Sequence, residues 1–339
     1  MQIQVNGRYL VQRVTGVQRY AREIVARLGE RVEVISPNRA GKGVTGHLWE
    51  QTILPCRLRR GLLWSPSATG PLAIQSQVVT IHDCAFFDSP AGFSRTFAAW
   101  YRCLVPRLAK RVRRILTVSE FSRQRISELC RVSPDKISVI PNGVDARFRP
   151  LSEEQRTAEK NRLQLPGAYV LCVGSLEPRK NLPRLLEAWD RLGAEKDGLT
   201  LVLAGVKSHV FRDSHLGAPP ADVYLTGYVA DDDLPALYAG AEAFVFPSLY
   251  EGFGLPVLEA MACGTPVVCS QTTAVAEIAS DAAVLVDPLS TESIADGLSR
   301  LLADRQLRAT MSQRGILRAK QFSWDEAARQ TWDVLASAV

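Results

Sequence analysis

The sequence predicts an α/β protein made of two doubly wound domains, and three observations support this expectation. The chain has 339 residues, enough for two domains of ordinary size. Short apolar runs alternate with segments of helical period, a pattern typical of parallel sheets covered on both faces. Charge also divides the chain. Residues 1–150 carry 24 Lys and Arg against 10 Asp and Glu, a net charge of +14, whereas residues 151–339 carry 17 against 25, a net charge of −8. The two halves are therefore expected to face different partners.

In the first half, the near-continuous apolar runs predict six strands, and segments of helical period fill the gaps between them. The strands are expected at Ile3–Asn6, Val32–Ser36, Leu62–Ser65, Val78–His82, Ile115–Val118 and Ser138–Ile140. The helices are expected at Gly16–Leu28, His47–Arg59, Ser94–Arg111 and Glu120–Cys130.

The second half repeats this alternation after a polar, charge-rich stretch that opens at Leu151, so a domain boundary is predicted between Pro150 and Pro166. The strands are expected at Tyr169–Val173, Leu199–Ala204, Val223–Leu225, Ala243–Phe246, Pro266–Cys269 and Ala283–Val286. The helices include Leu182–Arg191, Asp233–Ala239, Pro256–Cys263, Thr291–Ala303 and a last helix capped by Ser323.

Composition excludes several classes of protein. Hydrophobic residues make up 46% and charged residues 22%, as in soluble globular proteins. The longest uncharged stretch, residues 61–81, contains two prolines and does not predict a membrane span. The N-terminus shows no signal-peptide pattern. Seven cysteines without a Cys-x-x-Cys spacing predict reduced, buried thiols, and the four histidines lack zinc-ligand spacing. We expect a cytoplasmic protein.

The segment from Phe244 to Gly264 has the pattern of a buried strand, a glycine-punctuated turn and a helix. The helix start near Gly254 and Leu255 offers free backbone N–H groups, which suit a pyrophosphate or sugar hydroxyls. Glu251 lies in the turn, where a carboxylate accepts hydrogen bonds from hydroxyls. Glu259 lies inside the helix among apolar residues, so it needs a partner.

The spacing of these two glutamates resembles the Glu-x7-Glu signature of family 4 of the retaining glycosyltransferases. These enzymes have the GT-B fold, in which two facing Rossmann-like domains flank a deep interdomain cleft. Further segments resemble family motifs in the same order along the chain: Val79–Asp83, Thr117–Ser122, Val139–Asp145, Gly174–Asn181 and Leu225–Val229. The resemblance covers nearly the whole chain.

The resemblance implies a catalytic set of Glu251, His82, Arg179 and Lys180. Arg179 and Lys180 would clamp the diphosphate, whose leaving oxygen gains charge that a metal-free site must neutralise with cations. His82 would orient the donor sugar or stabilise the developing oxocarbenium ion. The residues expected to bind the donor are Gly16, Gly174, Ser175, Arg179, Lys180, Tyr228, Val229, Ser248, Glu251, Gly252, Phe253, Gly254, Leu255 and Glu259.

Two positions depart from the family pattern. Many relatives have an arginine where this chain has Ser175, and many have two glycines where this chain has Gly16 alone. The resemblance also implies that residues 1–155 with 322–339 form an acceptor-binding domain, whose last helix returns from a nucleotide-sugar-binding domain of residues 156–321.

The function expected is transfer of a hexose, with mannose from GDP-mannose favoured, to a hydroxyl of a lipid-linked or oligosaccharide acceptor in surface polysaccharide or O-antigen assembly. The anomeric configuration would be retained by front-face attack. A UDP-sugar or GDP-deoxyhexose donor stays open, as do a sugar-nucleotide epimerase and a non-catalytic nucleotide-sugar-binding homologue. No metal or other cofactor is expected, and no nucleic-acid partner.

Two charged segments have alternative interpretations. The basic residues Arg107, Lys110, Arg111, Arg113 and Arg114 predict either a contact with an anionic membrane or lipid-diphosphate acceptor, or a solvated helix face. A peripheral place on the cytoplasmic membrane face therefore stays open. The three aspartates at 231–233 suit a helix start better than a metal site.

Overall fold

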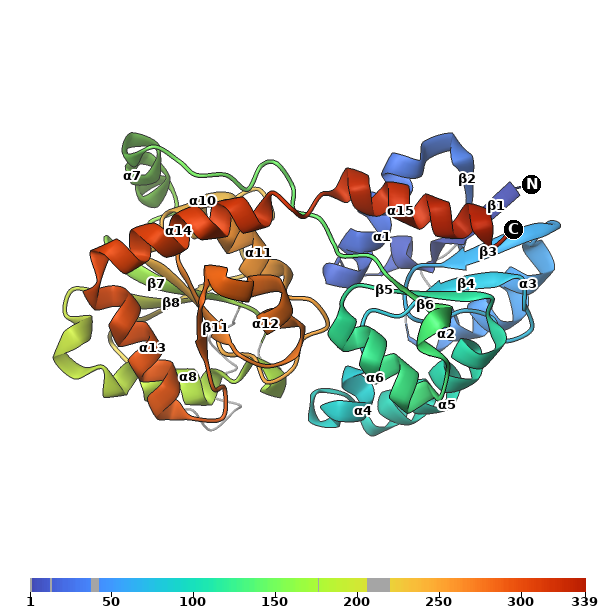
Figure 1. Ribbon diagram of the computed structural model, residues 1–339, viewed down its shortest axis with the longest axis horizontal. Coiled ribbons are helices and arrows are strands. Elements are labelled where there is room, and N and C mark those ends of the chain that lie inside the picture. The colour runs from blue at the N-terminus through green and yellow to red at the C-terminus, as the bar shows by residue number, and fades with distance from the viewer. Residues whose placement is uncertain (1, 13, 38–42, 176, 206–219) are drawn as a thin grey trace. The chain divides into compact units, whose positions relative to one another are not determined.

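The computed structural model describes residues 2–12, 14–37, 43–175, 177–205 and 220–339, and the chain forms two compact units (Figure 1). Unit 1 comprises Met1–Gly143 and Phe322–Val339, and unit 2 comprises Val144–Gln321. The sequence placed the boundary later, at residue 155. The polar stretch after Pro150 forms helix α7 (Glu153–Arg162), and α7 packs against a helix of unit 2, α10 (Leu234–Ala239). Leu176, within the predicted diphosphate loop, lies outside the described residues.

Unit 1 contains a parallel six-stranded sheet with the order β2-β1-β3-β4-β5-β6. Its strands are β1 (Gln2–Asn6), β2 (Val32–Ile35), β3 (Gly61–Ser65), β4 (Gln77–Thr80), β5 (Arg114–Thr117) and β6 (Ile137–Val139). Its helices include α1 (Gly16–Leu28), α2 (Val44–Leu48), α3 (Leu54–Arg57), α4 (Ala85–Asp88), α5 (Arg95–Arg111), α6 (Glu120–Cys130) and α15 (Trp324–Ser337).

The core of unit 1 has helices on both faces of the sheet. Val105 and Leu108 of α5 and Ile126 of α6 pack with Val79 and Ile115 of the strands. The C-terminal helix α15 packs along α1 (Figure 1). Ser323 caps α15 by accepting hydrogen bonds from two backbone N–H groups of its first turn, as the sequence predicts.

Unit 2 contains a second parallel six-stranded sheet, with the order β12-β11-β10-β7-β8-β9. Its strands are β7 (Tyr169–Val173), β8 (Thr200–Ala204), β9 (Val223–Gly227), β10 (Ala243–Phe246), β11 (Val267–Ser270) and β12 (Val284–Val286). Besides α7 and α10, its helices include α8 (Leu182–Arg191), α11 (Leu255–Ala262), α12 (Thr273–Ala279), α13 (Thr291–Ala303) and α14 (Arg305–Ala319).

Alternate residues of these strands face two different helix layers, as the period of a strand requires. On one face, Val170 and Val245 pack with Trp189 of α8 and Leu298 of α13. On the other face, the ring of Phe244 meets Tyr238 of α10 edge-on at a centroid distance of 5.4 Å. Burial on both faces explains why the strands read as continuous apolar runs.

The predicted strands match the observed ones to within two residues at each end. The helix predicted at 47–59 is instead three short pieces, α2, a π-helical segment at Trp49–Ile53, and α3. In the part of the chain that the structure describes, no helix is both long and apolar enough to cross a bilayer.

The strand orders define one switch point in each sheet. In unit 2 the order reverses between β7 and β10, and in unit 1 it reverses between β1 and β3. Ligands of doubly wound sheets bind outside the carboxyl ends of the strands at such points, because the loops there run in opposite directions. These two places are where a site is expected.

Candidate functional site

Two cations and two carboxylates meet at the switch point of unit 2. Lys180 Nζ lies 2.6 Å from Glu251 Oε1, and Arg179 Nη1 lies 2.7 Å from Glu251 Oε2. Arg179 Nε lies 2.5 Å from Glu177 Oε2. The cations follow β7, and Glu251 follows β10. We call Glu177, Arg179, Lys180 and Glu251 the switch-point cluster.

Glu251 is ionised at neutral pH despite its burial. Burial alone would raise its pKa, but the charges of Lys180 and Arg179 outweigh that effect and hold the pKa below the ordinary 4.5. The same balance, with Arg179 as the main positive charge, lowers the pKa of Glu177. The side chain of Arg179 is 21% exposed, against 10% for Lys180 and Glu251, so the guanidinium is the more accessible of the two cations.

Lys180 is held from a second side by an aromatic ring. Its Nζ lies 4.6 Å from the ring centroid of Phe246, a cation–π distance, at the end of β10. An ammonium group has three N–H donors, and the contact with Glu251 uses one of them. Lys180 is thus fixed in place while it keeps donor capacity for an anion.

Asn181 ties together the loops that carry the cluster. Its φ of +60° is left-handed, a conformation that asparagine tolerates better than most residues. Its Nδ2 donates to the carbonyls of Pro247 at 3.1 Å and Pro288 at 2.6 Å. The N–H of Leu249 also donates to the carbonyl of Arg179 at 2.7 Å. These hydrogen bonds fix the positions of the loops after β7, β10 and β12 relative to one another.

The helix that follows Glu251 begins one residue before the predicted Pro256. Gly254 adopts a φ of +109°, which favours glycine, and α11 starts at Leu255 with Pro256 in its second position. The predicted donor residues Ser248, Gly252 and Phe253 are buried in the turn before this start. Pro256 has no N–H, and the N–H groups of Val257 and Leu258 donate to the Gly254 carbonyl, so the N–H groups of Gly254 and Leu255 are the ones here that are suited to an anion.

Glu259 has the partner that its burial requires. The hydroxyl of Tyr238, on α10, donates to Glu259 Oε2 at 2.9 Å. The sequence did not identify Tyr238, nor Glu177, Phe246 and Asn181, as part of the site. The sequence could have indicated Glu177, because a carboxylate two residues before Arg179 in the same short loop is close enough to pair with it.

The remaining predicted donor residues of unit 2 lie on loops after β7 and β9. Gly174 directly follows β7 and approaches the stem of Lys180 closely, since a Cβ there would lie 3.5 Å from Lys180 Cδ. Ser175 Oγ donates to Glu177 Oε1 at 2.7 Å, so it extends the cluster. Tyr228 is exposed after β9, and Val229 is half-buried beside it.

In unit 1, His82 is buried and neutral. Its Nε2 lies 2.9 Å from the carbonyl oxygen of Pro66, and because a carbonyl only accepts, Nε2 carries the proton. Burial lowers the pKa of His82 to about 4, although this hydrogen bond opposes the shift. The ring of Tyr20 packs edge-on at 4.8 Å. Gly16 is exposed at the start of α1.

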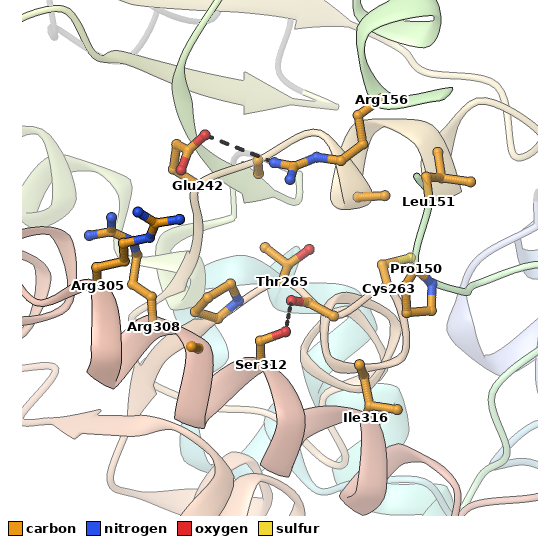
Figure 2. Close-up of a pocket in the computed structure, with 15 residues that line it drawn as sticks. Pro150, Leu151, Arg156, Glu242, Cys263, Thr265, Arg305, Arg308, Ser312 and Ile316 are labelled. Carbon is orange, nitrogen blue, oxygen red and sulfur yellow. Dashed lines mark hydrogen bonds and ion pairs between the residues drawn. The ribbon is translucent and has the colours of Figure 1, made fainter. Parts of the chain in front are cut away.

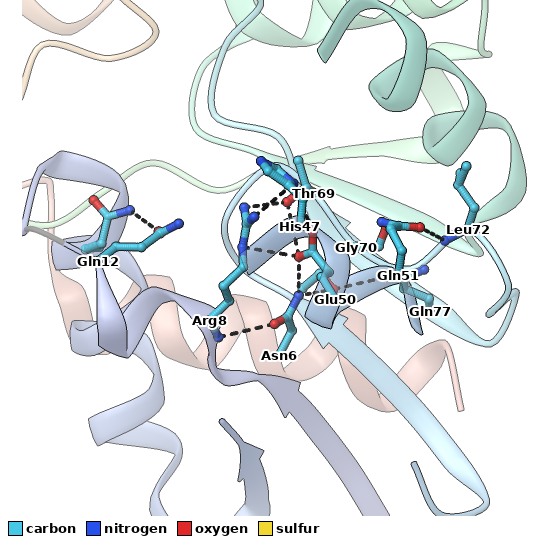
Figure 3. Close-up of polar contacts among 12 residues, drawn as sticks. Asn6, Arg8, Gln12, His47, Glu50, Gln51, Thr69, Gly70, Leu72 and Gln77 are labelled. Carbon is cyan, nitrogen blue, oxygen red and sulfur yellow. Dashed lines mark hydrogen bonds and ion pairs between the residues drawn. The ribbon is translucent and has the colours of Figure 1, made fainter. Parts of the chain in front are cut away.

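A second polar cluster, which the sequence did not reveal, lies at the switch point of unit 1 (Figure 3). Glu50 Oε1 accepts from Asn6 Nδ2 at 2.6 Å and from Thr69 Oγ1 at 3.1 Å. Arg8 Nε lies 3.6 Å from the same oxygen, and Arg8 Nη1 lies 2.9 Å from His47 Nδ1. We call these five residues the Arg8–Glu50 cluster.

Glu50 is ionised although it is completely buried. Its burial would raise its pKa, but the charge of Arg8 and hydrogen bonds from neighbouring side chains lower it below 4.5. His47, at the outer side of this cluster, packs against the rings of Trp100 and Tyr101, each at a centroid distance of 5.7 Å. The cluster thus reaches from a buried ion pair to the half-exposed indole of Trp100.

The basic segment of unit 1 divides into two kinds of residue. Arg113 donates to the carbonyls of Ala338 and Val339, and Arg114 donates to that of Asp135 at 2.6 Å. These two stabilise the fold. All five basic side chains are exposed, and those on α5 are Arg107, Lys110 and Arg111.

Two of the aspartates at 231–233 form ion pairs near the start of α10. Asp232 pairs with Arg147 at 3.1 Å, and Asp233, the N-cap residue, pairs with Arg162 at 2.7 Å. Among the described residues, no three His, Cys, Asp or Glu side chains gather as metal ligands would.

Comparisons with known proteins agree with this geometry. Residues 153–318 match the family model of glycosyl transferases group 1, and residues 65–148 match that of glycosyltransferase family 4. The O-antigen chain mannosyltransferase B of Escherichia coli is 35% identical over 269 residues, which cover 77% of this chain and 70% of the relative.

Other relatives are longer. The serotype-specific mannosyltransferase WbdA of Escherichia coli is 30% identical over 63% of this chain, but the match spans only 27% of WbdA. Among solved structures, HepE of Anabaena in complex with UDP and glucose has a TM-score of 0.77 at 19% identity, covering 99% of this chain and 100% of HepE. The two parallel sheets, the whole-chain structural match and the sequence relatives place this chain in family 4 of the retaining glycosyltransferases, with the GT-B fold.

Proposed function

We propose that this glycosyltransferase moves mannose from GDP-mannose to a hydroxyl of a lipid-linked or oligosaccharide acceptor in surface polysaccharide or O-antigen assembly. Its likeness to the O-antigen chain mannosyltransferase B supports both the sugar and the kind of acceptor. The observation that carries the catalytic part of the proposal is Glu251, held between Lys180 and Arg179 at the switch point of unit 2.

The donor is assigned to unit 2 on the chemistry of that cluster. Lys180, Arg179 and the start of α11 would bind the diphosphate, because all three present donors to an anion. Glu251 keeps both cations in place and would accept a hydrogen bond from the sugar. Glu259, oriented by Tyr238, would accept from the ribose. Tyr228 and Val229 would lie against the base.

The reaction breaks the bond between the anomeric carbon and the diphosphate oxygen. The acceptor oxygen forms its bond to that carbon on the same face, and the acceptor proton passes to the leaving phosphate oxygen. The negative charge of the departing diphosphate then lies against Lys180 and Arg179, which stabilise it without a metal. His82, being neutral, would contribute through hydrogen bonding and position rather than through charge.

The acceptor is assigned to unit 1. Support comes from the half-exposed Trp100, whose ring packs on His47 of the Arg8–Glu50 cluster. Arg107, Lys110 and Arg111 would meet anionic lipid or a lipid diphosphate, because they are exposed on one helix of a basic unit. The enzyme would then work at the cytoplasmic face of the membrane.

A transfer assay tests the proposal. Purified enzyme is incubated with GDP-mannose, a GDP-deoxyhexose or UDP-glucose, together with synthetic mannosides on a lipid diphosphate. We expect a mannosylated product from GDP-mannose, with the α-configuration of the donor seen by NMR. If UDP-glucose were the only donor that gave product, the enzyme would be a UDP-sugar transferase instead. Conversion of a donor without acceptor would favour an epimerase, and binding without product would favour a non-catalytic homologue.

A further inference from the structure

A cavity of about 440 Å³ opens in unit 2, lined by the residues drawn in Figure 2. It lies at the end of the sheet opposite the switch-point cluster. Glu242 and Pro266, which line it, directly precede β10 and β11, so the cavity lies at the amino ends of these strands. Gly264, just after the end of α11, forms another part of its wall. The cavity is therefore separate from the carboxyl-end loops that carry Glu251 and Lys180.

Three arginines line this cavity against a single carboxylate. Arg156 comes from α7, and Arg305 and Arg308 come from the first turn of α14, while Glu242 is the one acidic residue among the lining residues. Unit 2 as a whole has 18 Lys and Arg against 23 Asp and Glu, a net charge of −5. A concentration of positive charge on an acidic unit marks a place for an anion.

Two of these arginines, Arg305 and Arg308, have no carboxylate partner within the described ranges, and Arg156 has two. Arg156 Nη1 lies 3.4 Å from Glu153 Oε2 and Nη2 lies 3.9 Å from Glu242 Oε1, whereas its Nε is buried without a hydrogen-bond partner in the described structure. Arg308 donates to the carbonyls of Leu301 and Leu302, which are neutral acceptors. Arg305 forms no hydrogen bond or ion pair within the described ranges. Their remaining N–H groups match the oxygens of a phosphate.

The rest of the wall is mixed, because the hydroxyl-bearing Thr265 and Ser312 lie beside apolar residues. Leu151, Ile316 and Pro266 line the cavity, and Cys263 adds a buried thiol. The cavity exceeds what a bare phosphate ion needs and falls in the size range of organic ligands. We propose that it binds a phosphate ester, whose charged group contacts Arg156, Arg305 and Arg308 and whose organic part lies on the apolar residues of the wall. This site is independent of the proposed transferase function.

Isothermal titration with three probes tests the proposal: inorganic pyrophosphate, glucose 1-phosphate and geranyl diphosphate. The first variant is Arg305→Ala, which should leave the fold unchanged because the side chain of Arg305 is exposed. The second variant is Arg156→Gln. The matched control is Arg314→Ala, which removes the same charge from the same helix where Arg314 pairs with Asp281 instead. A Lys180→Met variant reports binding at the switch-point cluster.

We expect Arg305→Ala and Arg156→Gln each to weaken binding of the organic phosphates about tenfold, since a hydrogen bond to a charged group is lost. Arg314→Ala and Lys180→Met should leave that binding unchanged. Tighter binding of glucose 1-phosphate would identify a soluble sugar phosphate, and tighter binding of geranyl diphosphate a lipid phosphate. Equal affinity in all variants, loss of binding in Lys180→Met alone, or no binding by wild type would overturn the proposal.

Discussion

Each unit of this glycosyltransferase places an arginine, a glutamate and further polar side chains at the switch point of its sheet, but the two clusters differ in exposure. In unit 2, Arg179 is 21% exposed and Glu251 pairs with two cations. In unit 1, Arg8 is 3% exposed, and Glu50 is completely buried and has one arginine partner. The first cluster is open to a ligand, whereas the second is closed by its own side chains.

This difference in exposure indicates that the two clusters have different functions. Two cations on one carboxylate leave donors for a diphosphate, so the unit 2 cluster is suited to developing charge. One arginine on one carboxylate, completed by Asn6 and Thr69, leaves little for a ligand and instead fixes the loops around His47. We therefore expect substitutions in unit 2 to affect catalysis, and substitutions in unit 1 to affect stability and acceptor binding.

The largest effect is expected from Lys180→Met. Loss of one donor to a developing charge lowers kcat by about 10²- to 10³-fold. Lys196→Met is the matched control, because Lys196 also pairs with a carboxylate, Asp222, and also lies over an aromatic ring, that of Trp189. It lies outside the site, so its kcat should equal that of wild type. Equal losses of kcat in Lys180→Met and Lys196→Met would contradict a catalytic role for Lys180.

The double variant Lys180→Met with Glu251→Gln sharpens this test. Lys180→Met alone leaves the buried carboxylate of Glu251 with less compensation, so it should also lower stability. Glu251→Gln removes that charge and should restore the urea midpoint without restoring kcat. Recovery of activity together with stability would mean that the cluster is structural.

The next largest effect is expected in unit 1. Arg8→Met leaves Glu50 as a buried, uncompensated charge and should lower the free energy of unfolding by about 3 kcal/mol. Hydrogen exchange read by mass spectrometry should show faster exchange in unit 1 peptides, and GDP affinity should not change. Arg27→Met breaks the exposed pair with Asp325 and should cost under about 1 kcal/mol. A loss of GDP affinity in Arg8→Met would contradict the separation of tasks.

A pH effect is expected from His82, whose pKa is lowered from 6.5 to about 4. The native state prefers the neutral ring, so this contribution to stability is fully present above pH 6.5 and is lost as the pH falls toward 4. Between pH 7 and pH 5, wild type should lose about 2 kcal/mol through this group. His82→Gln should flatten that part of the stability curve in urea titrations. An unchanged slope would show that His82 is protonated near its ordinary pKa.

The smallest effect is expected from Gly143→Ala. A Cβ at Gly143 would lie 2.1 Å from the backbone nitrogen of Trp324, where α15 begins, so the substitution should cost at least about 1 kcal/mol. Gly167→Ala is the control, since nothing lies within 4 Å of its Cβ. Differential scanning calorimetry should show a lower Tm for the first variant alone. Equal Tm values for the two variants would mean that α15 moves to accommodate the added Cβ without a loss of stability.

The sequence predicted most of the unit 2 site because its residues are close along the chain. Arg179 and Lys180 are adjacent, and Glu251 and Glu259 share one strand–turn–helix segment, so local patterns identify them. Tyr238, the partner of Glu259, lies on another helix, and no local pattern links the two. That Glu251 pairs with both cations also depends on the strand order, which places β7 beside β10.

The unit 1 cluster escaped prediction for the same physical reason. Asn6 and Glu50 are 44 residues apart, and Arg8 and Thr69 are 61 apart. Glu50 also lies in a π-helical segment where a regular helix was expected, which changes the direction of its side chain relative to the helical period. The polar stretch that forms α7 was not assigned a helix, because its stability comes from the capping box of Ser152 and Gln155 rather than from an apolar face.

The central claim is that the Lys180–Glu251 pair holds the nucleotide sugar, and calorimetric titration of GDP-mannose tests it most directly. The three proteins compared are wild type, Lys180→Met and Lys196→Met. We expect at least about tenfold weaker binding to Lys180→Met and unchanged binding to Lys196→Met, because only Lys180 would contact the diphosphate. Equal affinity for all three proteins would contradict the claim.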